Sequence, residues 1–514
     1  MIPIIPTILT ITCSLMFSFA YSQPQPGDVF REYKWYNGYG DSGQALRVGG
    51  KQDYGGYDVK FPRSIDLVQA TRAEIIVEKI LCHTGTHGLS VSLNNNDWIA
   101  VPESDSIPYP QWNYQHHTYP VVKVPLAYLS SGNGNVFRLK VDTDSPDWPQ
   151  NLIYGFHIRI YYDKDLKSYP HGVISSLQDG DILGDEVSLR VDVTETDTSI
   201  VQVDYIGYYE GVNWEGDGQY QQWHCHYFHG DLIHHIGSAT TAPYNVIWDI
   251  GWLPDQRHPI QIAARITDDT GMIYFTDSVK NLTLGRATYS VELCKPHNVS
   301  WGWVTRRDNK SEKFNLSGDL QRAVEARMVW TSWSAGHMNG IYINDSLVFD
   351  VEGEPHRYKA HNVDISDFIH VLKQGENKLH TGVKTKDSEG EEIHGMEVQW
   401  PGIMVLLKYD LTTNTNVKNS CNELIRLFSL QQNSPNPFNP KTEIKFSLSH
   451  ESHVRLSVYN IVGQEIEVLI DGVRQPGIQS VEWNAQNSQT GIYFYKLTVP
   501  AQNRFEIRKM ILMK

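Results

Sequence analysis

The densest group of side chains able to do chemistry is a histidine-rich segment near the middle of the chain. It reads Trp-His-Cys-His-Tyr-Phe-His over residues 223–229 and continues with a histidine pair. On an extended strand, His224 and His226 project from the same face, as two ligands of one Zn²⁺ or Cu²⁺ ion would. The candidate metal ligands are His224, His226, His229, His234 and His235.

The same segment also offers acid–base chemistry. An imidazole titrates near pH 6.5, so His224 or His226, with Tyr227 beside them, could abstract a proton from a sugar ring. The carboxylates nearby are Glu210, Glu215, Asp217 and Asp255, and their spacing selects none of them. No HExxH or other strong metal motif is present. Packing of the rings between domains, or hydrogen bonds to backbone carbonyls, explains the histidines as well.

Aromatic side chains form a second kind of candidate site, a stacking surface for sugars. Pro108 and Pro110 stiffen a loop rich in tryptophan and tyrosine, and a ring fixed near the surface can stack on the apolar face of a pyranose. The candidate carbohydrate-binding residues are Trp98, Trp112, Tyr114, Trp148, Trp301 and Trp303. Ordinary packing is an equal alternative for them. Trp330 follows two apolar residues in a strand pattern and is predicted to be core.

Acidic turns give a candidate calcium site. Asp142, Asp144 and Asp147 lie close together, and carboxylate oxygens are the ligands that Ca²⁺ prefers. Solvated turn carboxylates are the simpler explanation.

Four cysteines follow the N-terminal segment, namely Cys82, Cys225, Cys294 and Cys421. They are far apart and show no CxxC spacing, so their disulfide pairing cannot be deduced.

Length and charge limit the class of protein. The chain has 514 residues, which indicates three or four domains. Its formal net charge of -15, with dispersed Lys and Arg, argues against nucleic acid and against an anionic membrane surface as partners. The 14 Trp and 28 Tyr residues suit a sugar-binding protein, although large β cores use the same residues.

The N-terminus has the features of a secretory signal. Residues 8–19 are almost wholly apolar, and the small residues Ala20 and Ser22 precede Gln23. We therefore expect a signal peptide over 1–22 and Sec export to the periplasm. Because no Lys or Arg precedes the apolar stretch, a retained anchor is the alternative. No later segment is long and apolar enough to predict membrane insertion after processing.

Between the termini, alternating apolar and polar residues separated by Gly, Pro, Asn and Asp predict an all-β chain of tandem β-sandwiches. A repeat supports this division. Leu93-Asn94 and a Leu-x-x-Gly element in the first unit correspond to Ile343-Asn344 and the same element in a later one. The expected domains are β-sandwiches at 28–166 and 288–411, a middle domain at 167–287 that carries the histidine-rich insertion, and a linker at 412–423.

The last domain, residues 424–514, has its own pattern. It opens with Gln-Asn-Ser-Pro-Asn-Pro-Phe-Asn-Pro, in which three prolines exclude helix and central strand. Strict alternation follows: Ile444, Phe446 and Leu448 face one way, with polar residues between them. This pattern predicts a small antiparallel sandwich.

This tail resembles the C-terminal sorting domain of the type IX secretion system of Bacteroidetes-type bacteria. The resemblance rests on the proline-rich opening, the TEIKFSL, VRLSVYNIVGQEI and GIYFYKL strands and the basic end. The matching positions are Pro435, Pro437, Pro440, Gly463, Gly491, Lys509 and Lys514. It implies interaction with the type IX machinery and a final location outside the cell or on its outer surface, whether anchored or released.

The repeated units at 28–166 and 288–411 resemble galactose-binding-like jelly rolls, and the middle domain resembles bacterial immunoglobulin-like modules. Both resemblances point to polysaccharide as the partner. The preferred hypothesis is a non-catalytic carbohydrate-binding protein. A glycan-degrading lyase, hydrolase or amidase that uses the histidine-rich loop is the first alternative, and a structural adhesin or spacer is the second. The pair of jelly rolls faintly resembles bacterial peptide N-glycanase, but no acid pair can be assigned.

Overall fold

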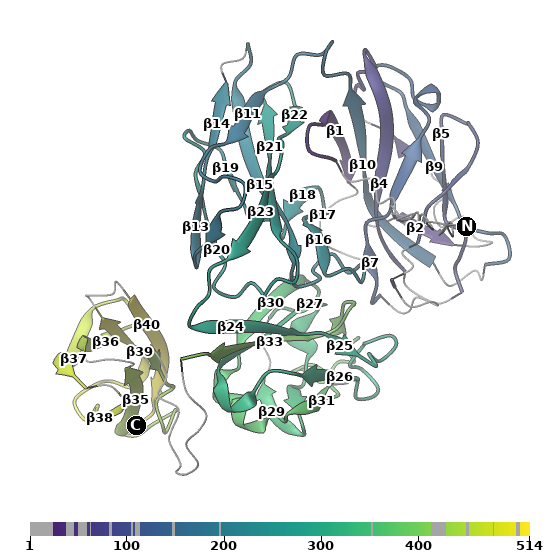
Figure 1. The fold of residues 1–514 in the computed structure, drawn as a ribbon. Helices are drawn as coiled ribbons and strands as arrows, with labels where there is room; N and C mark the ends of the chain where they lie inside the picture. The colour runs from purple at the N-terminus through teal and green to yellow at the C-terminus, as the bar shows by residue number, and fades with distance from the viewer. Residues whose placement is uncertain are drawn as a thin grey trace, which may run out of the picture. The chain divides into compact units, whose positions relative to one another are not determined.

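The computed structural model of the chain describes residues 24–36, 46–49, 59–61, 63–81, 85–103, 106–107, 114–145, 150–194, 197–350, 353–412, 428–448, 452–475, 477–499 and 504–514. Several predicted features lie outside these residues, namely the expected signal peptide, most of the expected linker, Trp112, Asp147, Trp148, Cys82 and Cys421. The chain divides into two compact units, residues 1–413 and 414–514 (Figure 1). Within the described ranges, no helix has the length and apolar character needed to cross a membrane.

The larger unit contains three β-sandwiches, each built around its own apolar core. In the first sandwich, one sheet holds β1 (Val29–Tyr36), β2 (Leu46–Gly49), β4 (Ala70–Leu81), β7 (His117–Thr118), β8 (Val121–Val124) and β10 (Gln150–Tyr162). The facing sheet holds β3 (Val59–Lys60), β9 (Val136–Lys140), β5 (Ser90–Leu93) and β6 (Ile99–Ala100). A short 3-10 helix, η1 (Leu126–Tyr128), precedes β9.

The middle sandwich continues the first without a break in the sheet. Its strands are β11 (His171–Ile174), β12 (Ile182–Leu183), β13 (Glu186–Leu189), β14 (Val191–Thr194), β15 (Ile200–Glu210), β20 (Val246–Asp249), β21 (Ile260–Asp268), β22 (Met272–Phe275) and β23 (Val279–Leu284). Strand β22 pairs with β1 in antiparallel register, with Val29 opposite Tyr274, so that one 13-stranded sheet runs through both sandwiches.

The long insertion of the middle sandwich is not an irregular loop. Its strands are β16 (Gln221–His224), β17 (His226–Phe228), β18 (Asp231–Ile233) and β19 (Gly237–Ala239). Strand β16 extends the 13-stranded sheet by pairing with the end of β15, and β17 and β18 form a separate hairpin. The insertion lies between the first and middle sandwiches in Figure 1.

In the third sandwich, one sheet holds β24 (Tyr289–Cys294), β33 (Met404–Asp410), β27 (Ala323–Trp333), β30 (Tyr358–Asp364) and β32 (Glu397–Val398). The other holds β25 (Pro296–His297), β26 (Ser311–Leu316), β31 (Gly375–Thr381), β28 (Ile341–Ile343) and β29 (Ser346–Phe349). Three 3-10 helices connect strands: η2 (Leu320–Arg322), η3 (Ala335–His337) and η4 (Ser366–Val371).

The first and third sandwiches share strand order and a local hydrogen-bond network. The order β1-β10-β4-β8 corresponds to β24-β33-β27-β30, and β3-β9-β5-β6 corresponds to β26-β31-β28-β29. In the first sandwich, Asn94 has a positive φ and donates to Asn135 Oδ1 at 2.8 Å. Asn344, also at positive φ, donates to Asn377 Oδ1 at 2.8 Å in the third. The two sandwiches therefore have the same topology.

The smaller unit is a separate antiparallel sandwich. Its sheets are β34 (Phe428–Leu430), β35 (Lys441–Leu448) and β38 (Gly477–Asn484), and β37 (Glu465–Arg474), β36 (Ser452–Asn460), β39 (Gly491–Val499) and β40 (Arg504–Leu512). Ile444, Phe446 and Leu448 are buried while Glu443 and Lys445 are exposed, which confirms the predicted alternation. The proline-rich opening forms no strand, and its Phe438 packs into the core at 2% exposure.

Candidate functional site

One face of the first sandwich is polar although it is buried. Along β1, β4 and β10, residues that point away from the apolar core alternate with core residues. The buried polar side chains of these strands include Glu32, Glu74, Glu78, His157 and Arg159. The histidine-rich insertion covers them: Tyr227 donates a hydrogen bond to Glu32, and the backbone amide of His229 donates to Glu78 at 3.0 Å.

A buried charge cluster joins the first and middle sandwiches at this face. Arg159 of β10 contacts Glu32 at 2.9 Å and also Glu74, and Arg265 of β21 contacts Glu32 at 2.8 Å. Burial alone raises the pKa of Glu32, but the guanidiniums of Arg265 and Arg159 outweigh it and hold this pKa well below its usual range. Glu32 is thus ionised between two cations.

The five histidines proposed as metal ligands do not meet at one point. His224 faces Glu215 and the Tyr209 carbonyl, and His235 faces Ser238. His226 and His234 have ring centroids 5.0 Å apart, whereas His229 packs against Tyr154. The strand is interrupted at Cys225, so His224 and His226 have different partners. One metal ion held by all five rings is therefore incompatible with the structure.

The catalytic candidates differ in their protonation. Burial and the neighbouring His234 lower the pKa of His226 well below its usual range, so that its ring is neutral at neutral pH. Burial raises the pKa of the Tyr227 phenol, whose hydroxyl is already bonded to Glu32. Tyr227 therefore serves to join the insertion to the first sandwich. Cys225 is a free thiol, and burial raises its pKa to about 12, so that it is un-ionised.

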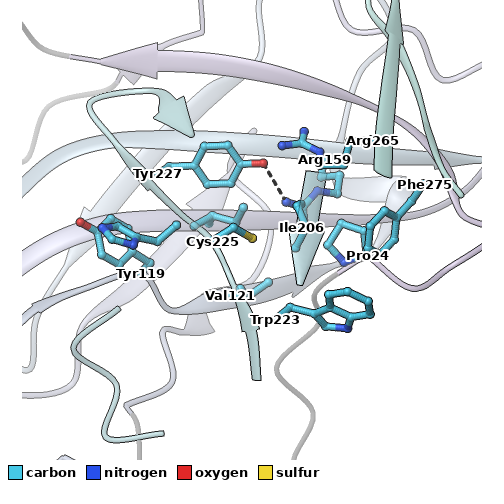
Figure 2. A pocket seen from close by; sticks show the side chains of 12 residues that line it. Pro24, Tyr119, Val121, Arg159, Ile206, Trp223, Cys225, Tyr227, Arg265 and Phe275 are labelled. Atoms are coloured by element: carbon cyan, nitrogen blue, oxygen red, sulfur yellow. Dashed lines mark hydrogen bonds between the residues drawn. The ribbon is translucent and has the colours of Figure 1, made fainter. Parts of the chain in front are cut away.

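Two adjoining pockets lie beneath the insertion, each with about 570 Å³ of space between atoms, part of it open to solvent. Both are lined by Tyr119, Val121, Cys225 and His226. The first, here called the arginine pocket, is also lined by Arg159, Arg265, Trp223 and Phe275. Figure 2 shows it, with the dashed line marking the 3.4 Å contact between Arg159 and the Tyr227 hydroxyl. Its arginines already bind Glu32.

The second, here called the acidic pocket, lies on the other side of Tyr119 and His226. It is also lined by Pro102, Glu103, Ile107, Thr118, Pro120, Glu215 and Asp217. Strands β7 and β8 of the first sandwich and the loop between β15 and β16 of the middle sandwich thus supply its walls.

Close packing fixes the loop that carries Glu215 and Asp217. Gly216 between them has a φ of +68°, and its amide donates to the Asn213 side chain at 3.0 Å. A Cβ at this position would lie 3.2 Å from the His117 carbonyl and 3.3 Å from the Trp400 carbonyl. Only glycine combines this backbone conformation with so close an approach to the first and third sandwiches. The loop is therefore held where all three sandwiches meet.

The two carboxyl groups of the acidic pocket have different environments. His224 Nδ1 lies 3.2 Å from Glu215 Oε1, and its Nε2 lies 2.8 Å from the Tyr209 carbonyl. Burial lowers the pKa of His224, but the Glu215 carboxylate reverses the effect and leaves this pKa raised. For Asp217, burial and the negative charge of Glu215 raise the pKa to about 7. Glu215 is thus part of an ion pair, while Asp217 is partly protonated at neutral pH.

Three buried polar atoms at the acidic pocket have no hydrogen-bond partner among the described residues. They are Thr118 Oγ1, Glu215 Oε2 and His226 Nδ1. Their residues are 6%, 6% and 8% exposed. No sequence signal selects Thr118, and the spacing of the four nearby carboxylates favours neither Glu215 nor Asp217. Of the other two, Glu210 pairs with Lys295 and Asp255 with Arg286, and neither lines a pocket described here.

The proposed aromatic platforms separate into exposed and buried residues. Trp98 is 42% exposed, with Lys140 Nζ 4.7 Å from its ring centroid, and Trp301 is 55% exposed. Trp303 is wrong as a surface ligand because it is fully buried, with its indole bonded to Thr381 at 3.1 Å. Tyr114 is half-buried and packs beside Ile80, Leu152 and Tyr154. Trp330 is fully buried, as predicted.

The acidic turn of the first sandwich gains a histidine that sequence reasoning missed. Donor atoms of His87, Asp142 and Asp144 all lie within 4.8 Å of one another, and no other such group occurs among the residues that the structure describes. His87 Nδ1 lies 2.8 Å from the Gly85 carbonyl, which turns Nε2 toward Asp144 at 3.2 Å. A histidine–carboxylate ion pair accounts for this geometry, and a bound cation here stays a prediction.

The comparisons with known proteins identify the C-terminal unit. Residues 434–513 match the family described as the secretion system C-terminal sorting domain. No curated protein matches the chain significantly.

Three solved structures show distant likeness. The fibronectin(III)-like modules of Clostridium thermocellum CbhA match at 18% identity over 23% of this chain and 100% of theirs, with a TM-score of 0.15. The β-porphyranase BpGH86A of Bacteroides plebeius matches at 13% identity over 48% of this chain and 38% of its own, with a TM-score of 0.16. PorZ of Porphyromonas gingivalis matches at 8% identity over 69% and 40%, with a TM-score of 0.13.

The family match and the strand pattern agree on the tail. The chain is a multidomain β-sandwich protein that ends in a type IX secretion sorting domain, and it is therefore a secreted or cell-surface protein.

Proposed function

We propose that the exported protein binds a glycan outside the cell, and that the acidic pocket holds one sugar unit of it. The observation that carries this proposal is the group of unpartnered atoms at the pocket, Thr118 Oγ1, Glu215 Oε2 and His226 Nδ1. Each buried polar group without a partner costs about 1–3 kcal/mol. A ligand that bonds to these atoms together recovers this free energy.

The chemistry of the pocket walls favours a sugar over other small ligands. Pro102, Ile107, Pro120 and Val121 supply apolar surface, and Tyr119 supplies a ring. A pyranose has an apolar face for such walls and a rim of hydroxyls that donate and accept hydrogen bonds. One hydroxyl can donate to the Glu215 carboxylate while another bonds with Thr118, and such convergent polar groups on an apolar wall are typical of ligand sites.

The rest of the chain fits the same role. Trp98 and Trp301 expose rings that can stack on further sugar units, although they lie in different sandwiches. The assignment of the first and third sandwiches as galactose-binding-like jelly rolls, and of the middle one as immunoglobulin-like, belongs to this proposal. The identity of the partner as a polysaccharide is also part of this proposal, because the sorting domain establishes only export.

Thr118→Val tests the proposal with little risk to folding. Because the Thr118 hydroxyl has no partner among the residues that the structure describes, valine, which has nearly the same shape, should leave the thermal midpoint unchanged or higher. Loss of one hydrogen bond to the ligand should weaken binding by about 3–10-fold. Binding of the full-length secreted protein is measured by calorimetry against algal, plant and host glycans.

The matched control is Thr86→Val, in the first sandwich. Thr86 Oγ1 is likewise buried and unpartnered, and Thr86 lines neither pocket. We expect its glycan affinity to equal that of the wild type. Equal losses in both variants would contradict the assigned pocket. Absence of binding to every glycan would leave the adhesin or spacer hypothesis in its place.

A further inference from the structure

Glu215 and Asp217 form a pair of carboxyl groups in which one is paired with a histidine and the other can carry a proton. Both line the acidic pocket, and Gly216 separates them in the chain. The two ring nitrogens of His224 face acceptors only, namely the Glu215 carboxylate and the Tyr209 carbonyl. A ring that donates at both nitrogens is an imidazolium, so Glu215 Oε1 has a fixed cation beside it. Its Oε2 has no partner among the described residues.

Asp217 is placed to exchange protons with solvent. It is half-buried, and its Oδ1 accepts hydrogen bonds from the Gln219 amide at 2.9 Å and from Gln222 at 3.2 Å. These donors and the more distant His224 favour the ionised form, while burial and Glu215 favour the protonated form and prevail.

The other ionisable groups that face the pocket do not supply a competing proton donor. Glu103 is paired with Lys79 at 2.6 Å. Burial raises the pKa of the Tyr119 phenol well above its usual range, raises that of the Cys225 thiol to about 12 and keeps His226 neutral. Asp217 is therefore the acid of the pocket near neutral pH, and Glu215, which is paired with His224, is its hydrogen-bond acceptor.

A proton donor and a carboxylate in one pocket are the two groups that hydrolysis of a glycosidic bond requires. We propose that the acidic pocket hydrolyses the terminal glycosidic bond of its bound glycan, with Asp217 as general acid and Glu215 as general base. This inference rests on the proposed glycan binding and adds a reaction to it.

The proposed step balances with water as the only co-reactant. Asp217 gives its proton to the glycosidic oxygen as the bond from that oxygen to the anomeric carbon breaks. A water molecule forms the new bond to that carbon and gives one proton to Glu215 Oε2. Asp217 and Glu215 return to their starting states by proton exchange through solvent, which reaches the half-buried Asp217. Thr118 and His226 are assigned to hold the hydroxyls of the terminal sugar.

The test compares turnover and binding in the same full-length protein. The probes are the oligosaccharides that the wild type binds and the 4-nitrophenyl glycosides of their terminal sugars. We expect the wild type to release the terminal sugar, and Asp217→Asn and Glu215→Gln to lower kcat on the oligosaccharides by at least about 100-fold. Binding of both variants should persist, and their circular dichroism should match the wild type.

Two further readouts separate the roles from loss of structure. The 4-nitrophenolate leaves with little acid assistance, so Asp217→Asn should lose much less activity on nitrophenyl glycosides than on oligosaccharides, whereas Glu215→Gln should lose activity on both. Asp231→Asn, an exposed residue of the same insertion that lines neither pocket, serves as the control and should keep the wild-type rate.

Each outcome decides between the two proposals. A wild-type protein that binds glycans but releases no sugar overturns the hydrolysis while glycan binding stands. Wild-type rates in both acid variants also overturn it. If no glycan binds at all, the proposed function itself fails, and the hydrolysis fails with it.

Discussion

The sorting domain buries apolar side chains, whereas the junction between the first and middle sandwiches, beneath the histidine-rich insertion, buries charged ones. In the sorting domain, buried faces are made of residues such as Ile444 and Leu456, and charged pairs such as Lys441 with Glu482 lie at the surface. At the junction, Glu32, Arg159 and Arg265 are buried together. Apolar side chains can pack against many different apolar neighbours, whereas a buried charge requires an oppositely charged partner at a defined position. The sorting domain is thus suited to be an independent unit, and the junction to be a precisely assembled one.

The largest expected effect separates the two regions by removing one. Deletion of residues 414–514 should abolish export, because the sorting domain carries the signal for the type IX machinery. Glycan affinity of the remaining unit, purified from the cells, should be unchanged, because that unit contains all three cores and both pockets. Immunoblots of medium, cell surface and periplasm measure export. Normal export of the truncated chain would contradict the assigned role of the tail.

The second prediction compares one ion pair from each region. Glu32→Ala leaves Arg159 and Arg265 buried without their shared carboxylate and should cost about 3–5 kcal/mol in unfolding free energy. Glu482→Ala breaks the exposed pair with Lys441 and should cost less than about 1 kcal/mol. Urea unfolding of the two full-length variants measures both. Similar costs would show that the junction is no more dependent on its charges than the surface is.

The same contrast explains which features of each region the sequence can predict. The sorting strands follow from local alternation, because each residue of the pattern Glu443-Ile444-Lys445-Phe446 faces core or solvent within its own sandwich. On β4, Glu74 and Glu78 alternate with apolar residues in the same way and look like a solvent face. Both are 1% exposed: the insertion from the middle sandwich covers Glu78, and Glu74 is buried beside Arg159. The local alternation of residues cannot reveal that a distant segment packs over this face.

The site illustrates the same limit. The histidine-rich segment was found from its composition, and it does line the pockets through His226. Thr118 and Glu215 are distant in sequence and meet only because β7 and the β15–β16 loop pack together. Residue type alone makes Trp303 a candidate sugar ligand, yet its position in the third core buries it. Residue type identified the chemistry, but only tertiary packing decided which side chains share a pocket.

A third prediction concerns pH. Burial lowers the pKa of His234 to about 4 and that of His226 well below its usual range, whereas both titrate near 6.5 in the unfolded chain. Between these values the unfolded state binds more protons. The stability that these two histidines contribute to the larger unit therefore falls as the pH falls below about 6.5, by up to about 1.4 kcal/mol per pH unit for each histidine. Asp217, whose pKa burial raises to about 7, acts in the opposite direction.

His224 opposes this trend, because its raised pKa adds stability that is complete below about pH 6.5 and is lost as the pH rises through the folded pKa. Among the described residues of the sorting domain, the one histidine is His453, whose side chain is about half exposed. Urea unfolding between about pH 7 and 5 should move the transition of the larger unit and leave that of the sorting domain nearly constant. His234→Phe should flatten the dependence, and a parallel shift of both transitions would refute the explanation.

The smallest expected effect concerns the exposed tryptophans. Trp98 lies in the first sandwich, where Lys140 covers one side of its ring and solvent reaches the rest. Trp98→Ala should cost no more than about 1 kcal/mol in unfolding free energy, the size of an exposed cation–π contact. If the acidic pocket is the principal site, Trp98→Ala should weaken glycan binding less than Thr118→Val does. Loss of the surface ring removes only a stacking contact, and the ligand still bonds to the buried polar atoms of the pocket. Calorimetry on both variants measures the difference. A larger loss in Trp98→Ala would move the principal site to the surface of the first sandwich, because affinity would then follow the exposed ring and not the buried hydroxyl.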